Sequence, residues 1–107
     1  MLVKHINMSP DLSKPWNQWY LQAVQTKNIL IDVGLKEADK NHEVFENKDV
    51  WKIYLAMDYG SGNFRSSSIV SFDKENMSIK TKRGSIYKLG EPFNEKQVEN
   101  LEHFLSN

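Results

Sequence analysis

Four β-prone runs between residues 50 and 89 constrain the fold more than any other part of the chain. Successive side chains of a strand point to opposite faces, and in the first run, 50–58, one face is entirely apolar: Trp51, Ile53, Leu55 and Met57. The other runs span residues 64–72, 77–83 and 85–89, and turn-forming residues separate them at 59–63, 73–76 and Gly84. Short β-prone runs with regular turn signals predict an antiparallel meander.

Two amphipathic helices are predicted to pack on this sheet. Residues 14–26 place five apolar side chains at the spacing of one helix face, namely Trp16, Trp19, Tyr20, Ala23 and Val24. The same segment also suits a strand, because residues 19–24 are rich in aromatic and β-branched side chains. Residues 94–106 begin with Asn94 and Gln97 in capping-box spacing and continue with a stripe that should be buried: Val98, Leu101, Phe104 and Leu105.

The remaining segments complete the predicted fold. A compact apolar run at 29–33, ended by Gly34, indicates a further strand, and residues 35–49 form a long, partly helical loop that Val44 and Phe45 attach to the core. Residues 1–12 are either flexible or an edge strand. We expect one α+β domain over residues 1–107, an antiparallel four- or five-stranded meander sheet packed by an N-terminal and a C-terminal helix. The alternative is a small barrel-like sheet with the C-terminal helix plugging one end.

The composition excludes several kinds of site. The chain has no cysteine, so disulfides, cysteine-based zinc sites and a thiol nucleophile are excluded. Its histidines, His5, His42 and His103, lie in separate contexts, and no catalytic or phosphate-binding motif occurs. We therefore predict no metal, no cofactor and no enzyme activity. No apolar run is long enough to span a membrane, and the first residues do not resemble a secretory signal, so we expect a cytoplasmic protein.

The charges cancel in number but are unevenly distributed. The 14 basic and 14 acidic residues give a net charge of zero, which disfavours a purely electrostatic nucleic-acid binder. Residues 31–50 are predominantly acidic, whereas the later part of the meander is predominantly basic. The sequence therefore predicts a basic surface on the meander.

The candidate partner-binding residues are aromatic and basic side chains of the meander: Tyr54, Tyr59, Phe64, Arg65, Lys80, Lys82, Arg83 and Lys88. Tyrosine and arginine are frequent in the hot spots of protein interfaces, so these residues suit a protein partner. Aromatic rings beside cations also suit stacking on single-stranded nucleic acid. The sequence does not separate these two kinds of partner.

One segment carries a resemblance to known proteins. Residues 81–90 have the pattern TxxGSxYxLG and follow a serine-rich strand at residues 65–70. This combination resembles small phage and mobile-element proteins of undetermined activity. The resemblance implies a biological setting and assigns no role to any residue.

These observations lead to a functional hypothesis with one main alternative. We expect a non-catalytic protein-binding module, in the setting of the resemblance a phage or mobile-element inhibitor of a host defence complex, as anti-CRISPR proteins are. The alternative is a single-stranded nucleic-acid-binding protein that uses the basic meander. An enzyme whose site the sequence does not reveal is a third hypothesis.

Overall fold

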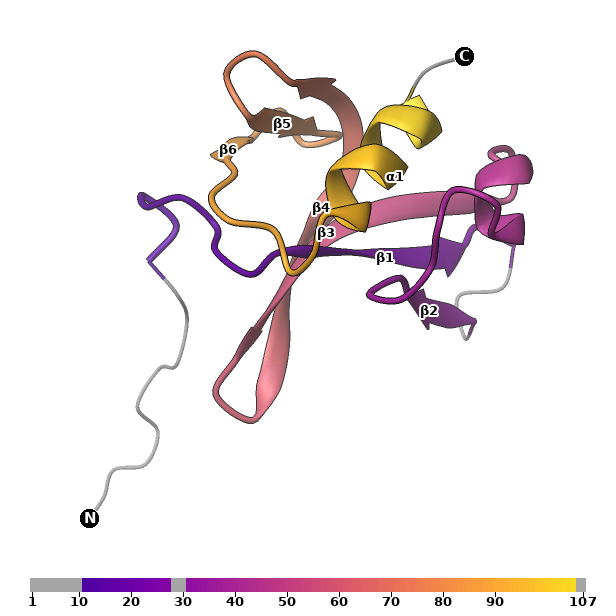
Figure 1. Ribbon diagram of the computed structural model, residues 1–107, viewed down its shortest axis with the longest axis horizontal. Coiled ribbons are helices and arrows are strands. Elements are labelled where there is room, and N and C mark those ends of the chain that lie inside the picture. The colour runs from indigo at the N-terminus through magenta and orange to yellow at the C-terminus, as the bar shows by residue number, and fades with distance from the viewer. Residues whose placement is uncertain (1–10, 28–30, 106–107) are drawn as a thin grey trace.

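The computed structural model describes residues 11–27 and 31–105. Its elements, in chain order, are β1 (Tyr20–Gln25), β2 (Asp32–Gly34), the 3-10 helix η1 (Glu43–Glu46), β3 (Trp51–Tyr59), β4 (Gly62–Asp73), β5 (Ser78–Thr81), β6 (Ile86–Lys88) and α1 (Lys96–Leu105). The strands form one antiparallel sheet in the order β2-β1-β3-β4-β5-β6 (Figure 1). The predicted meander is therefore present, and β1 and β2 extend it on the β3 side.

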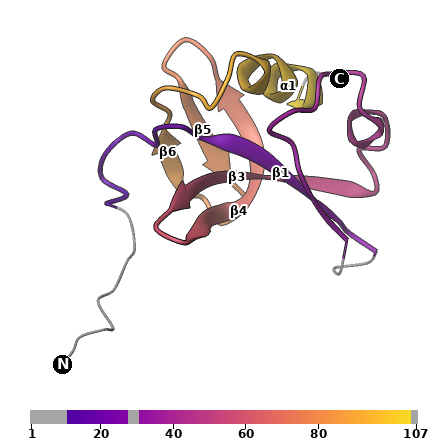
Figure 2. The same cartoon turned by 60° about the horizontal axis from the view of Figure 1, so that its bottom comes forward.

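Strand β3 lies in the middle of the sheet and supplies much of the core. The four residues predicted to face inward are all buried: Trp51, Ile53, Leu55 and Met57. They pack against buried side chains of β4 and β5, Ile69 and Ile79, and against Leu101 of α1. Helix α1 covers one side of the curved sheet, as Figure 2 shows.

The predicted N-terminal helix at 14–26 is wrong. Residues 20–25 form β1, which pairs with β3 along its whole length from Tyr20↔Ala56 to Gln25↔Trp51. Both faces of this strand are partly covered, so the neighbouring residues Tyr20 and Leu21 are both buried. Apolar side chains on both faces of a strand fall at helical spacing by coincidence, which explains the error.

The predicted number of strands is also wrong, because the sheet has six strands rather than four or five. The strand predicted at 29–33, before the meander, corresponds to the short edge strand β2. The first two residues of that prediction lie outside the described part of the chain. The edge strand considered within residues 1–12 also lies almost wholly outside the described residues. The additional strand is β1, where a helix was expected.

The segment before β1 pairs with the segment after β6. Residues 16 and 19 form isolated parallel bridges, Trp16↔Leu89 and Trp19↔Pro92. The Trp19 Nε1–H group also donates to the carbonyl oxygen of Gly90 at 3.0 Å, and both tryptophans are fully buried. These contacts connect the segment before β1 with the segment after β6, which is an edge strand of the sheet.

The loop at 35–49 and helix α1 are held together by buried amides. Val44 and Phe45 of η1 are buried, so the predicted attachment of the loop is confirmed. At the start of α1, Asn94 Oδ1 accepts from the Lys96 N–H group at 3.1 Å, as expected of a cap. Gln97 departs from the capping-box expectation, because its side chain bonds to Leu21, to loop carbonyls and to the Asn94 side chain.

Candidate partner-binding groove

A groove on the sheet is lined by four cationic side chains and, among the described residues, by no acidic one. It has a volume of ≈ 500 Å³ and is lined by Lys52, Tyr54, Arg65, Ser66, Ser67, Ser68, Lys82 and Arg83. These residues come from β3, from β4 and from the turn between β5 and β6. We call this set of residues the cationic groove.

The pleat of β3 and two irregularities in β4 build the cationic groove. Lys52 and Tyr54 alternate with the buried residues of β3 and therefore share its other face. In β4, Ser66 and Ser67 together oppose the single residue Leu55, whose N–H group donates to Ser66 Oγ at 3.1 Å. A second register shift follows at Val70. Such bulges bend a strand and redirect its side chains. Two of the groove-lining serines, Ser66 and Ser67, form the first bulge, and Ser68 lies between the two.

The arginine of β4 is held in place, whereas the other cations are not. Arg65 Nη1 donates to Asp32 Oδ2 at 2.9 Å, and its guanidinium lies over the Tyr54 ring at 5.4 Å from the centroid. The exposed side chains of Lys52, Lys82 and Arg83 make no hydrogen bond or ion pair with any residue in the described ranges. The groove thus presents positive charge that the described part of the protein does not neutralise.

The structure brings together half of the residues predicted from the sequence. Tyr54, Arg65, Lys82 and Arg83 line the cationic groove. The other four lie elsewhere and are Tyr59, Phe64, Lys80 and Lys88. Tyr59 ends β3 and is exposed, whereas the Phe64 ring packs on Trp16 at 5.8 Å. Lys80 is exposed on β5, and Lys88 Nζ donates to the carbonyl oxygen of Asn76.

Sequence reasoning missed Lys52 and the three serines of β4 as groove residues. Lys52 had a usable signal, because it alternates with Trp51 and Ile53 and must share the face of Tyr54. The serines had none, since their position depends on the two bulges, and a register shift leaves no reliable mark in a single sequence.

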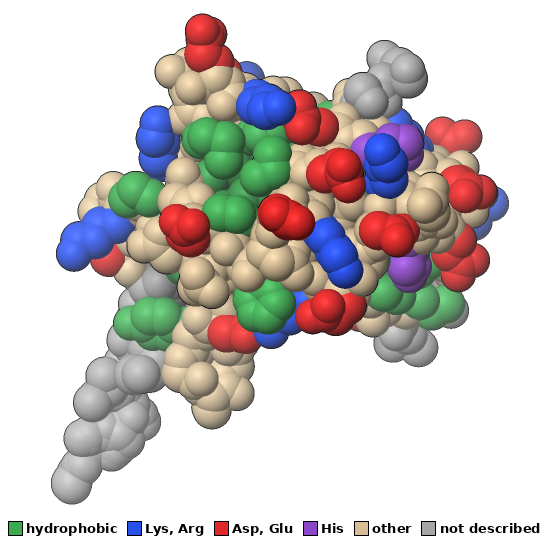
Figure 3. Space-filling view, in the orientation of Figure 1, with side chains coloured by type: hydrophobic (Ala, Val, Ile, Leu, Met, Phe, Trp, Pro, Cys, Tyr) green, Lys and Arg blue, Asp and Glu red, His purple; other side chains and the backbone are tan. Residues whose placement is uncertain are grey.

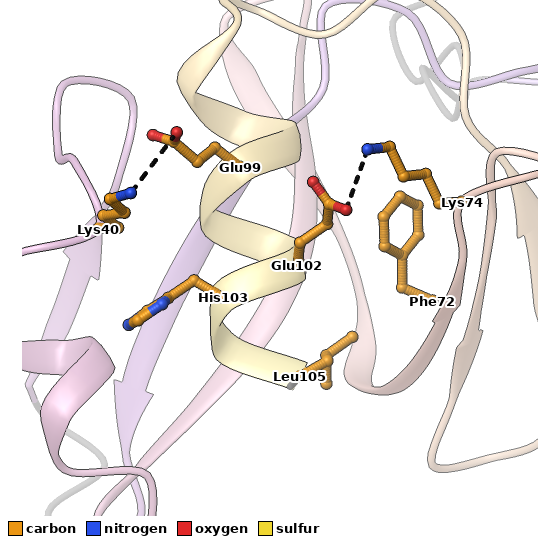
Figure 4. Close-up of a pocket in the computed structure, with 7 residues that line it drawn as sticks. All are labelled: Lys40, Phe72, Lys74, Glu99, Glu102, His103 and Leu105. Carbon is orange, nitrogen blue, oxygen red and sulfur yellow. Dashed lines mark ion pairs between the residues drawn. The ribbon is translucent and has the colours of Figure 1, made fainter. Parts of the chain in front are cut away.

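A second hollow, beside α1, differs from the cationic groove in its charge. It is lined by Lys40, Phe72, Lys74, Glu99, Glu102, His103 and Leu105. Figure 4 shows Glu99 of α1 turned toward Lys40 and Glu102 turned toward Lys74, at N–O distances of 4.0 and 3.1 Å. On the face seen in Figure 3, acidic and basic side chains are likewise interspersed. Charges at this hollow are neutralised locally, so it shows no preference for a charged ligand.

A polar cluster connects the 35–49 loop to the sheet. Asp58 accepts from both Lys36 Nζ and the Tyr20 hydroxyl at 2.8 Å, and the Lys36 ammonium lies over the Tyr20 ring at 4.5 Å. The hydrogen bonds from Lys36 and Tyr20 lower the pKa of Asp58, and the bond to Asp58 raises the pKa of Lys36. Burial raises the pKa of Tyr20. The cluster therefore favours the charged forms of Asp58 and Lys36.

Comparison with known proteins identifies no relative: no family model, no curated protein and no solved structure matches this chain. Within residues 11–27 and 31–105, no three histidine, aspartate or glutamate side chains are grouped so as to hold a metal ion. No helix of the described chain is both long and apolar enough to cross a bilayer.

Proposed function

We propose that this protein is a non-catalytic binding module whose cationic groove engages an acidic surface of a protein partner. The observation that carries the proposal is the set of three cations, Lys52, Lys82 and Arg83, that line one groove without a partner among the described residues. Complementary charge across an interface speeds association and selects among partners. The host-defence setting implied by the resemblance at residues 81–90 stays a prediction, although that segment supplies Lys82 and Arg83.

The aromatic side chains favour a protein partner over single-stranded nucleic acid. Binding of single strands combines cations with several exposed rings on which bases stack. Among the described residues that line the cationic groove, Tyr54 is the only aromatic one. It is half-buried and already has Arg65 over its ring. Phe64 packs against Trp16 and Tyr59 lies at the end of the β3–β4 hairpin. The groove therefore offers charge and hydroxyl groups without a stacking platform.

Titration of the ¹⁵N-labelled protein tests this proposal. The probes are a deca-glutamate peptide and a ten-nucleotide oligothymidylate, each added in 150 mM salt. We expect the peptide to shift the amide signals of residues 52–54, 65–68 and 82–83, because its carboxylates meet the cations of the cationic groove. Tighter binding of the oligonucleotide to the same signals would instead establish nucleic acid as the partner. No shift with the peptide would contradict the proposal.

A pair of charge-reversal variants provides the control. Lys82→Glu with Arg83→Glu should abolish peptide binding, because both cations line the groove. Lys14→Glu with Lys80→Glu changes the net charge by the same amount at exposed positions outside it, and should bind the peptide nearly as well as the wild type. Equal losses in both double variants would show that net charge, and not the groove, determines binding.

A further inference from the structure

We infer that Arg65 is the fixed carboxylate-binding group of the cationic groove and that Asp32 and Tyr54 are positioning residues for it. This inference rests on the proposed function, because it names the side chain of the groove that would bind a carboxylate of an acidic peptide segment. The other cations of the groove then add charge without geometric preference. The inference thus gives Arg65 a different role from the other three cations that line the cationic groove, which are Lys52, Lys82 and Arg83.

Arg65 is held through a chain of contacts across four strands. Asn63 Nδ2 donates to Gln22 Oε1 at 3.2 Å, and Gln22 Nε2 donates to Asp32 Oδ1 at 2.7 Å. The other oxygen of the same carboxylate, Oδ2, accepts from Arg65 at 2.9 Å. Both oxygens of Asp32 are therefore occupied, and its orientation is fixed from two sides. The Tyr54 ring supports the guanidinium from a third direction.

The guanidinium retains donors for a ligand after it has met Asp32. Arginine carries five N–H donors in a rigid plane, and the structure shows one bond, from Nη1, to Asp32. Arg65 also lines the cationic groove. A carboxylate in the groove can accept two parallel N–H bonds from such a plane, which a lysine ammonium does not provide. Because Asp32 and Tyr54 already restrict the side chain, less conformational entropy is lost on binding.

Replacement of Asp32 separates positioning from simple electrostatics by the sign of its effect. Asp32→Ala makes the protein more positive by one charge, so a groove that acts only through charge should bind deca-glutamate more tightly. If Asp32 positions Arg65, the same variant should bind more weakly. Asp49→Ala is the matched control, since Asp49 is exposed, makes no ion pair within the described residues and lies outside the groove. It should bind as tightly as the wild type or slightly more tightly.

Two variants that keep the positive charge test whether the planar arrangement of the Arg65 N–H donors matters. Arg65→Lys should weaken binding of the deca-glutamate peptide about tenfold, the size expected for loss of a charge-assisted hydrogen bond. Arg83→Lys makes the same substitution at a groove cation that has no partner among the described residues, and should change the affinity less than about twofold. Calorimetric titration gives the affinities, and the ¹⁵N spectra show that each variant is folded.

The outcomes separate this inference from the proposed function. Weaker binding by Arg65→Lys and Asp32→Ala, with both controls close to the wild type, supports the inference. Equal affinities for Arg65→Lys and Arg83→Lys, or tighter binding by Asp32→Ala, overturns it while the groove remains the binding site. Absence of peptide binding by the wild type overturns the proposed function and the inference together.

Discussion

Gln97 shows how one buried side chain connects three parts of the molecule. Its Oε1 atom accepts from the Leu21 N–H group of β1 at 2.9 Å. Its Nε2 atom donates to the carbonyl oxygens of Leu35 and Lys36 and to the Asn94 side chain. The side chain is fully buried, so water cannot replace these bonds without rearrangement of the core.

Gln97→Leu should lower the free energy of unfolding by about 1–3 kcal/mol, because it leaves the buried Leu21 N–H group without an acceptor. Urea unfolding followed by circular dichroism measures the change. Glu95→Leu, at an exposed position two residues earlier, should stay within about 0.5 kcal/mol of the wild type. An unchanged midpoint for Gln97→Leu would show that the loop and β1 do not depend on this amide.

At the scale of the elements, helix α1 lies where the sequence predicted a helix, and its predicted apolar stripe packs on the core. Its predicted stripe contains Leu101, which is fully buried, and Val98, Phe104 and Leu105, which are half-buried. The sequence did not predict that the polar residues Gln97 and Asn100 are also fully buried. Their partners are backbone groups of β1 and of residues 35–38, and no periodicity identifies a partner so distant in sequence.

Leu101→Ala tests the contribution of α1 to the core. The change should cost about 2–5 kcal/mol of unfolding free energy, because it removes a fully buried side chain and leaves a cavity. Glu99→Ala, on the exposed side of the same helix, should cost less than about 1 kcal/mol, since its ion pair with Lys40 is at the surface. Comparable losses in the two variants would mean that Leu101 contributes no more than helix propensity.

The predictions from sequence succeeded where one face of an element is apolar and failed where both faces are covered. The alternation of β3 from Trp51 to Met57 identified its buried face, and the same alternation placed Tyr54 opposite. Tyr20 and Leu21 of β1 are both buried, and that pattern is indistinguishable from a helical stripe. The cationic groove was predicted in part, because charge clustering is visible in the sequence whereas its assembly depends on bulges in β4.

At the scale of the whole molecule, the pairing of Lys36 with Asp58 limits the pH range of full stability. The pKa of Asp58 lies below its ordinary value of 3.8, so its contribution is present above that value and is lost as the pH falls through the lowered pKa. The pKa of Lys36 lies above its ordinary value of 10.5, so its contribution is lost as the pH rises through the raised pKa. The contribution of the pair should be constant between these limits.

Asp58→Asn should therefore differ from the wild type in a pH-dependent way. The difference in unfolding free energy should be constant from about pH 5 to 9 and should shrink below about pH 4. Asp58 is then protonated first in the unfolded chain and, at lower pH, in the folded protein, because folding lowers its pKa. Urea midpoints measured across this range provide the comparison. Asp49→Asn, at an exposed aspartate without an ion pair among the described residues, should show no such convergence. A difference that persists unchanged at acid pH would contradict the proposed coupling.

The bridges between the tryptophan segment and the chain after β6 bear on the order in which the protein folds. The bond from Trp19 to Gly90 joins residues 71 positions apart, whereas β3 and β4 are joined by a tight turn. Closing a long loop costs more chain entropy than closing a short one, and distant pairings slow folding. The β3–β4 hairpin should form early and the tryptophan bridges last. During synthesis, the side chains of Trp16 and Trp19 therefore become fully buried only after residues 89–92 have left the ribosome.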